Sequence, residues 1–243
     1  MNTLSETSKP DTSSRTALVT GATSGIGRCI ADRLLADGYT VYGIGRNESG
    51  APSHGSFRFL PVDLADTAAI EREIKPIASE ITLLVNAAGT AYYGPHETIA
   101  PQAIAEMTAV NVAAPMILAA LLLPHLRDCA GTILNVSSVT AKSSANTHGC
   151  AYGATKAALS SFSASLFEET RKHGVKVITI HPDLTDTALY RNADFTTKDD
   201  PQYRLTAEEV ADCAMQALTA RDGMVVTDIT VRPQRNGIAR REP

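Results

Sequence analysis

The sequence predicts an α/β protein built on a doubly wound parallel sheet, with helices covering both faces to give three layers. Short apolar runs alternate along the chain with helical patterns, about seven times in all. Several of these runs are apolar at almost every position, which is typical of strands buried on both faces. Parallel strands joined through helices by right-handed crossovers form such a sheet.

The first strand and the first helix follow each other directly. Residues 17–20 form a short apolar run that predicts a strand. Beyond it, Ile26, Ile30 and Leu34 recur at every fourth position, which indicates a helix with one apolar stripe. Gly38 comes after the last of them and is predicted to end the helix.

The rest of the chain repeats this alternation. Further apolar runs predict strands at 40–44, 57–61, 81–85, 132–136, 175–180 and 224–231. Helices are predicted at 68–80, 101–126, 152–172 and 207–220. No repeat and no linker divides the chain, so residues 15–243 are predicted to form one domain. The polar residues 1–14, rich in Ser and Thr, are predicted to be a disordered tail.

Composition argues against several classes of protein. The net charge of −4 gives no sign of a nucleic-acid or membrane surface. No apolar run reaches the length of a membrane span, and the N-terminus lacks the apolar core of a signal peptide. The four cysteines are scattered without metal-ligand spacing. We therefore expect reduced thiols, no metal site and a cytoplasmic protein.

A glycine-rich turn joins the first strand to the first helix. Gly21, Gly25 and Gly27 have the spacing G-x-x-x-G-x-G, in the strand-to-helix context that nucleotide-binding loops need. Glycines let the backbone approach a pyrophosphate, and the helix N-terminus supplies amide donors. Thr23 and Ser24 can contact phosphate as well. The alternative is a tight turn with no ligand.

The second strand ends at Gly45 and Arg46. In NAD-binding sheets a carboxylate about 20 residues beyond the glycine loop binds the ribose 2′-hydroxyl. This sequence has a guanidinium at that distance instead, and arginine suits a 2′-phosphate. The sequence therefore favours NADP(H) over NAD(H), with an ordinary loop arginine as the alternative.

Tyr152 and Lys156 stand four residues apart in a predicted helix, so both side chains leave the same face. A lysine ammonium beside a phenol favours the phenolate; at about 4 Å and an effective dielectric near 20 the attraction is roughly 4 kcal/mol. The phenol would then work as a general acid–base near neutral pH, with the Ser138 hydroxyl on the same carbonyl oxygen. The alternative is a chance pair in solvent.

Taken together, the motifs resemble those of the short-chain dehydrogenase/reductase family in its single-domain form, over roughly residues 15–231. The resemblance rests on Thr20-Gly21-x-x-x-Gly25-x-Gly27, Asp63, Asn86-Ala87-Ala88-Gly89, Asn111, Ser138 and Tyr152-x-x-x-Lys156. It implies a Rossmann fold, hydride transfer between NADP(H) and a small-molecule carbonyl or secondary alcohol, and a homo-oligomer.

The resemblance also implies roles for single residues. Tyr152 would exchange a proton with the substrate oxygen, Lys156 would lower its pKa and bind the nicotinamide ribose, and Ser138, rather than Ser137, would hold that oxygen. Asn111 would hold a water that links Lys156 to solvent. The implied cofactor-binding residues are Gly21, Thr23, Ser24, Gly25, Ile26, Gly27, Arg46, Asp63, Leu64, Asn86, Ala87, Gly89, Tyr152, Lys156, Pro182, Thr185 and Thr187.

Plainer explanations exist for some of these residues. Asp63 is also a plausible N-cap of the next helix, and Asn111 can mark a local kink. Asn86 can simply satisfy loop amides, and His181 is expected to be an ordinary strand-end histidine.

The chain also departs from the family pattern. Ala87 replaces an asparagine, which should cost a hydrogen bond between neighbouring strands. Asp183 stands after Pro182, where the family usually has a glycine that lies close to the nicotinamide. The C-terminus lacks the usual apolar-glycine ending, which weakens the inference to a tetramer.

Substrate contacts are expected from the loops at 90–98, 139–150 and 188–204, and the last of these is interpreted as a mobile lid, or else as an ordinary surface connection. The helices that hold Asn111 and Tyr152 carry more apolar residues than one sheet face can cover, so we expect a homodimer or homotetramer. The alternatives to a reductase are a non-catalytic NADP(H)-binding sensor or scaffold, and a methyltransferase, which would need no Tyr-x-x-x-Lys.

Overall fold

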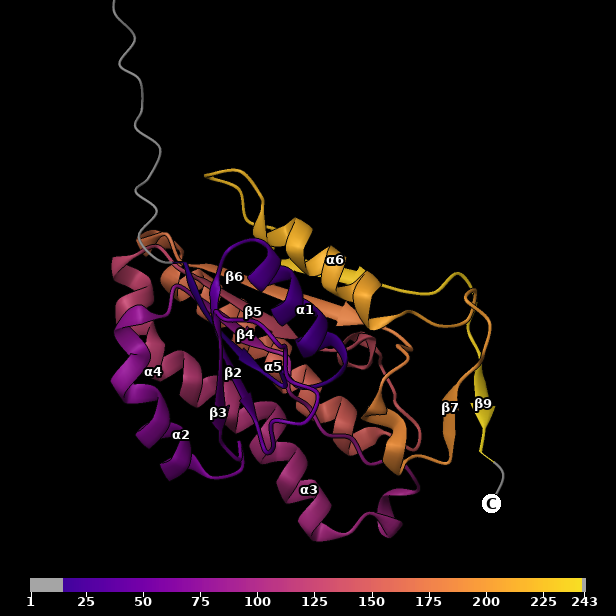
Figure 1. Ribbon diagram of the computed structural model, residues 1–243. Helices are drawn as coiled ribbons and strands as arrows, with labels where there is room; N and C mark the ends of the chain where they lie inside the picture. The colour runs from indigo at the N-terminus through magenta and orange to yellow at the C-terminus, as the bar shows by residue number, and fades with distance from the viewer. Residues whose placement is uncertain (1–14, 242–243) are drawn as a thin grey trace, which may run out of the picture.

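A seven-stranded parallel sheet forms the centre of the protein (Figure 1). The computed structural model describes residues 15–241, so the tail predicted at 1–14 lies outside the described residues. The strand order is β3-β2-β1-β4-β5-β6-β8. The strands are β1 (Thr16–Thr20), β2 (Thr40–Gly45), β3 (Phe57–Pro61), β4 (Leu83–Asn86), β5 (Thr132–Val136), β6 (Lys176–Pro182) and β8 (Asp228–Val231).

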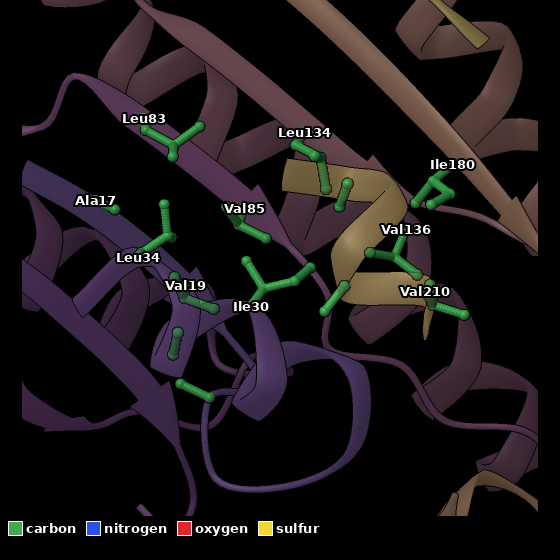
Figure 2. Close-up of a cluster of buried hydrophobic side chains, with 14 of the residues drawn as sticks. Ala17, Val19, Ile30, Leu34, Leu83, Val85, Leu134, Val136, Ile180 and Val210 are labelled. Atoms are coloured by element: carbon green, nitrogen blue, oxygen red, sulfur yellow. The ribbon is translucent and has the colours of Figure 1, made fainter. Parts of the chain in front are cut away.

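Helices cover both faces of this sheet, as predicted. One core lies under α1 (Gly25–Ala36) and α6 (Ala207–Leu218), and Figure 2 shows its side chains, with Ile30 of α1 beside Val85 of β4. The other core lies under α2 (Thr67–Ile74), α4 (Ala114–Asp128) and α5 (Cys150–Thr170). Strands between two such cores must be apolar on both sides, which explains the uninterrupted apolar runs.

Strand β1 shows how one short run serves both cores. Ala17 and Val19 pack in the core under α1, while Leu18 packs in the core on the opposite face. All three are 0 % exposed, because successive side chains of a strand leave opposite faces.

The last strand of the sheet is shorter than predicted. It spans Asp228–Val231 rather than 224–231. The amide of Met224 donates instead to the carbonyl of Arg221 at 3.0 Å, which makes the preceding residues a turn.

The helix predicted at 101–126 contains an irregular segment. α3 (Pro101–Thr108) continues through a π-helical turn, Ala109–Ala113, into α4. Asn111 is the buried residue of that turn, so it does mark a local irregularity, the alternative to a functional role. Such π-turns are rare and frequently occur at functional sites.

By length and composition, the 28-residue segment Pro101–Asp128 is apolar enough to cross a membrane, since an 18-residue window within it has a mean hydropathy of 1.9. The expectation that no segment reaches that length was therefore wrong. In this fold the segment packs on the sheet through Leu118, Leu122 and Leu126. Core helices of this kind pass the same test as membrane spans.

A second, smaller sheet was not predicted. β7 (Phe195–Thr197) and β9 (Ile238–Arg240) form an antiparallel ribbon, which stands beside the molecule, apart from the main sheet (Figure 1). The segment interpreted as a mobile lid, 188–204, is thus paired with the C-terminal part of the chain.

The glycine turn supplies a first prediction about the fold. A Cβ at Gly27 would lie 2.5 Å from the carbonyl oxygen of Gly21, so the loop and the helix could not keep their present contact. We expect Gly27→Ala to lower the free energy of unfolding by about 1–3 kcal/mol, measured by urea denaturation. Gly55→Ala is the matched control, because a Cβ there meets nothing within 4 Å. Equal losses in both variants would contradict this explanation.

Candidate active site

A cleft of about 750 Å³ opens at the carboxyl ends of the parallel strands. Parallel α/β sheets bind their ligands at this edge. The predicted site residues that line it are Gly21, Thr23, Ser24, Gly25, Ile26, Gly27, Arg46, Asp63, Leu64, Ala87, Gly89, Ser138, Tyr152, Lys156, Pro182, Thr185 and Thr187. Asn86 and Asn111 do not belong to its lining.

The glycine loop forms a cradle that side chains would fill. Gly21 and Gly25 have positive φ angles of 69° and 54°, which favour glycine. A Cβ at Gly21 would approach Cα of Ala88 to 3.0 Å. Ser24 precedes α1 as its N-cap, but its hydroxyl makes no capping hydrogen bond, and no acidic residue occupies the first turn. These features fit the pyrophosphate of a dinucleotide.

Arg46 reaches the cleft from the end of β2. Its side chain is 66 % exposed, and Nη1 lies 4.0 Å from Oε1 of Glu106. The other carboxylate oxygen of Glu106 accepts a hydrogen bond from the Tyr92 hydroxyl at 2.7 Å. The guanidinium is therefore held only loosely across the cleft and remains accessible to an anionic ligand.

The alternative explanations for Asp63 and Asn86 do not hold in the structure. Asp63 accepts a hydrogen bond from the amide of Ala65, whereas the N-cap of α2 is Asp66, so the capping alternative for Asp63 was wrong. Asn86 is buried behind the cleft, where its Nδ2 donates to Oδ1 of Asn135 at 2.8 Å. This bond ties β4 to β5.

Ala87 has no side-chain amide to bond the neighbouring strand, but two backbone amides make such a bond in its place. The amides of Ala87 and Ala88 both donate to the Thr20 hydroxyl at 3.0 Å. This hydroxyl, at the end of β1, therefore fixes the loop to the neighbouring strand without an amide side chain at position 87.

The end of β5 presents two serines with different surroundings. The Ser137 hydroxyl donates to the carbonyl of Lys156 at 3.1 Å and lies 2.8 Å from the Ser160 hydroxyl. The Ser138 hydroxyl, in contrast, accepts a bond from the Thr140 amide and faces the phenol of Tyr152. Ser138 is therefore the serine that can share a substrate oxygen with Tyr152.

Tyr152 and Lys156 lie one helical turn apart on α5, as predicted, and are 3 % and 4 % exposed. Nζ of Lys156 lies 5.9 Å from the centroid of the Tyr152 ring and donates to the carbonyl oxygen of Val136 at 2.8 Å. Burial raises the pKa of Tyr152 above its usual value, the nearby Tyr190 raises it further, and the Ser138 hydroxyl opposes the change.

The expectation that Lys156 lowers the pKa of Tyr152 is therefore wrong for this structure. The ammonium is turned to a backbone carbonyl, and the phenol is taken out of water, which disfavours its charged form. Burial also lowers the pKa of Lys156 itself to about 8.

The lowered pKa of Lys156 predicts a dependence of stability on pH. Between about pH 8 and 10.5, an unfolded chain still holds the proton that the folded lysine has lost. This group therefore contributes a rise in the free energy of unfolding with pH there, by up to about 1.4 kcal/mol per pH unit, whereas the Cys29 thiol, whose pKa burial raises to about 11, contributes with the opposite sign. Urea denaturation below about pH 9, where most tyrosines of the unfolded chain are neutral, measures the slope, and the difference from a variant without the lysine gives the contribution of Lys156.

Two lysine variants test that explanation. Lys156→Met should lose this contribution to the slope, because the group that titrates differently in the folded state is gone. Lys172→Met should keep it, since Lys172 is exposed. An unchanged slope in Lys156→Met would show that another group is responsible.

The side chain of Asn111 makes three hydrogen bonds. Its Oδ1 accepts from the Thr90 amide at 2.9 Å, and its Nδ2 donates to the Thr90 carbonyl and to the Thr155 hydroxyl. A Cβ added at Gly89 would lie 3.5 Å from Oδ1 of Asn111 and 3.4 Å from Nζ of Lys156. The side chains of Lys156 and Asn111 thus both approach Gly89, Lys156 from the cleft lining and Asn111 from outside it.

His181 proves more closely connected to the site than expected. It is 1 % exposed, and its Nδ1 lies 3.1 Å from the carbonyl oxygen of Ser138. Its Nε2 lies 2.9 Å from Oδ2 of Asp228, which also pairs with Lys142. Burial lowers the pKa of His181 despite these contacts. The sequence shows a histidine at a strand end but not its contact with Ser138.

Asp183, which departs from the family pattern directly after β6, is not an isolated charge, because both of its carboxylate oxygens have partners. Its Oδ1 accepts from the Leu184 amide, and its Oδ2 lies 3.9 Å from Nη1 of Arg232. Among residues 15–241, no group of three or more His, Cys, Asp or Glu side chains could hold a metal ion.

Comparison with known proteins agrees with this geometry. The family model described as short chain dehydrogenase matches residues 15–197. An uncharacterised oxidoreductase of Staphylococcus epidermidis is 30 % identical over 228 residues, which cover 90 % of this chain and 97 % of the relative.

Solved structures give the same picture. A short-chain dehydrogenase from Sphingobium yanoikuyae in complex with NADPH is similar with a TM-score of 0.75 and 27 % identity, covering 89 % of this chain and 87 % of that one. A 3-ketoacyl-(acyl-carrier-protein) reductase from Brucella melitensis complexed with NADH has a TM-score of 0.77 at 23 % identity, covering 89 % and 96 % of the two chains. The second likeness shows the fold alone.

Proposed function

Because this chain belongs to the short-chain dehydrogenase family and is an oxidoreductase, we propose that it transfers hydride between NADP(H) and a carbonyl or secondary alcohol. One observation carries the proposal: Ser138, Tyr152 and Lys156 line the same cleft as the glycine cradle. A proton donor, a hydrogen-bond donor and a dinucleotide site therefore meet in one place.

The chain's own groups fit the phosphorylated dinucleotide. The cradle and the open N-terminus of α1 suit the pyrophosphate. Arg46 provides the cation for the 2′-phosphate, and no carboxylate occupies its position at the end of β2. Thr187 lies against Gly25 of the cradle, which supports its assignment to the residues that bind the dinucleotide.

The bound dinucleotide would supply the hydride. Tyr152 would give its proton to the carbonyl oxygen in reduction and take it back in oxidation. Ser138 would donate a hydrogen bond to the same oxygen and so stabilise the charge that develops on it. Because burial raises the pKa of Tyr152, the phenol keeps its proton at neutral pH, which is the form that can donate to a carbonyl oxygen.

Lys156 and Asn111 would support that proton transfer. An ammonium has three donors, and one is used on Val136, which leaves donors for the ribose of the dinucleotide. The shared approach of Lys156 and Asn111 beside Gly89 supports a water, held by Asn111, that links Lys156 to solvent. This relay remains a prediction.

We also expect a homodimer or homotetramer in the cytoplasm. The outer side of α5 carries Ala154, Ala157, Ser161 and Ala164, all exposed, so a second helix could approach closely. The non-catalytic alternative is disfavoured because a sensor has no need for Ser138, Tyr152 and Lys156 together.

A titration followed by a turnover assay tests the proposal. Calorimetry with NADPH and NADH should show tighter binding of NADPH. A panel of ketones and aldehydes should then consume NADPH with the corresponding alcohol as product. Absence of dinucleotide binding would refute the proposal, and binding without turnover on any carbonyl would favour the sensor.

A further inference from the structure

Residues 235–241, near the C-terminus, pair with residues 194–202 of the loop that follows β6. β9 pairs with β7 from Phe195 opposite Arg240 to Thr197 opposite Ile238. Backbone bonds extend the contact on both sides, from the Arg241 amide to the Asp194 carbonyl at 2.8 Å and from the Arg235 amide to the Gln202 carbonyl at 2.7 Å. The C-terminal segment thus holds the middle of this loop.

Side chains reinforce this pairing. Nζ of Lys198 lies 4.2 Å from the centroid of the Tyr203 ring. A Cβ at Gly237 would lie 2.8 Å from that Nζ and 3.1 Å from Cδ1 of Tyr203. The close approach at Gly237 shows that the segment is packed and not merely adjacent.

The same ribbon forms part of the cleft. Phe195 of β7 and Ile238 of β9 both line the cleft, together with Asn236. Ile238 is 45 % exposed, and only Met224 equals it among the large hydrophobic side chains of residues 15–241. An apolar side chain left open on a cleft wall is suited to contact with an apolar ligand.

Aromatic rings continue this wall to the proton donor. The Tyr93 ring lies 5.5 Å from the Tyr152 ring and 5.0 Å from the Phe195 ring, measured between centroids. Tyr190 lies 5.4 Å from Phe195. Burial raises the pKa of Tyr93 well above its usual value, so this phenol stays uncharged at neutral pH.

We propose that the C-terminal strand β9 completes the substrate pocket, and that this pocket selects a flat, apolar, ring-bearing ketone or its alcohol. This inference rests on the proposed oxidoreductase function. Aromatic side chains recognise flat rings through stacked and edge-on contacts. Ile238 would lie against the far side of such a ring, while its carbonyl meets Tyr152.

Two variants and one control test the pocket. Ile238→Asp puts a charge where the ring would lie, and a chain ending at Pro233 removes the whole ribbon partner. Met224→Asp is the control, since Met224 has the same exposure but does not line the cleft. Each protein is assayed with NADPH and two ketones, acetophenone and the small aliphatic 2-butanone, and its affinity for NADPH is measured by calorimetry.

We expect Ile238→Asp and the shortened chain to raise the KM for acetophenone about tenfold or more, the equivalent of one lost apolar contact. The KM for 2-butanone and the affinity for NADPH should change less than about twofold in Ile238→Asp. Met224→Asp should resemble the unaltered protein throughout. An equal rise in KM for both ketones, or none for acetophenone, would overturn the proposal.

A binding experiment separates this inference from the proposed function. If the unaltered protein turns over neither ketone, saturation-transfer NMR of acetophenone with the protein and NADP⁺ replaces the assay. A signal that Ile238→Asp abolishes and Met224→Asp retains would support the pocket even without turnover. A signal equal in all variants, or absent from the unaltered protein, would overturn it.

Discussion

Replacing Tyr152 with phenylalanine should lower turnover at least about 100-fold, the lower range expected for one general acid–base group. The substitution removes a single oxygen from a side chain that is 3 % exposed and keeps the ring that packs against Tyr93. Because Ser138 would remain to hold the substrate oxygen, the loss should fall on kcat. Steady-state kinetics with NADPH measure it.

The control for this variant removes the hydroxyl oxygen of a tyrosine that lies outside the cleft. Tyr42 is also buried, and its hydroxyl bonds Glu80 at 3.0 Å, outside the cleft. Tyr42→Phe should retain turnover, and Tyr152→Phe should bind NADPH almost as tightly as the unaltered protein does. Turnover that persists in Tyr152→Phe would mean that another group donates the proton.

Replacing Arg46 with aspartate should reverse the choice of dinucleotide. The variant loses the cation proposed for the 2′-phosphate and gains a carboxylate that can bind a ribose hydroxyl instead. A hydrogen bond to a charged group contributes about 1.5–3 kcal/mol, so NADPH should bind roughly 10- to 100-fold more weakly. The affinity for NADH should stay the same or increase. Calorimetric titration with both dinucleotides measures the two changes.

Arg72→Asp is the matched control for Arg46→Asp. Arg72 is an exposed arginine on α2 that pairs with Glu73 and does not line the cleft, so its loss changes the net charge equally. It should leave both affinities unchanged. Equal losses for NADPH and NADH in Arg46→Asp would refute the assignment of Arg46 to the 2′-phosphate.

The main sheet could be predicted because its signals are local. The alternation of Ala17, Leu18 and Val19 between two cores requires an apolar residue at each position, and that requirement is visible in the sequence. The ribbon of β7 and β9 could not be predicted in this way. Each of its strands has three residues, and they pair across a long stretch of chain, so neither carries a recognisable period.

In the candidate site too, local sequence patterns predict some features, and contacts between distant segments decide the others. The spacing of Tyr152 and Lys156 predicts their shared helix face, because the helix fixes it. The direction of Nζ of Lys156 depends on the Val136 carbonyl, and the burial of the Tyr152 phenol depends on rings from distant segments. The predicted lowering of the Tyr152 pKa failed because neither contact is visible in the local sequence. The contact of His181 with Ser138 likewise depends on the pairing of β5 with β6.

Hydride transfer to a carbonyl carbon is tested most directly by isotope. NADPH carrying deuterium at C4 of the nicotinamide, prepared separately for each face, is incubated with the protein and acetophenone, and the product is examined by mass spectrometry and NMR. The structure predicts 1-phenylethanol with one deuterium on the carbinol carbon from one labelled face only. An alcohol without that deuterium, or one labelled only when the solvent is heavy water, would contradict direct transfer from the dinucleotide.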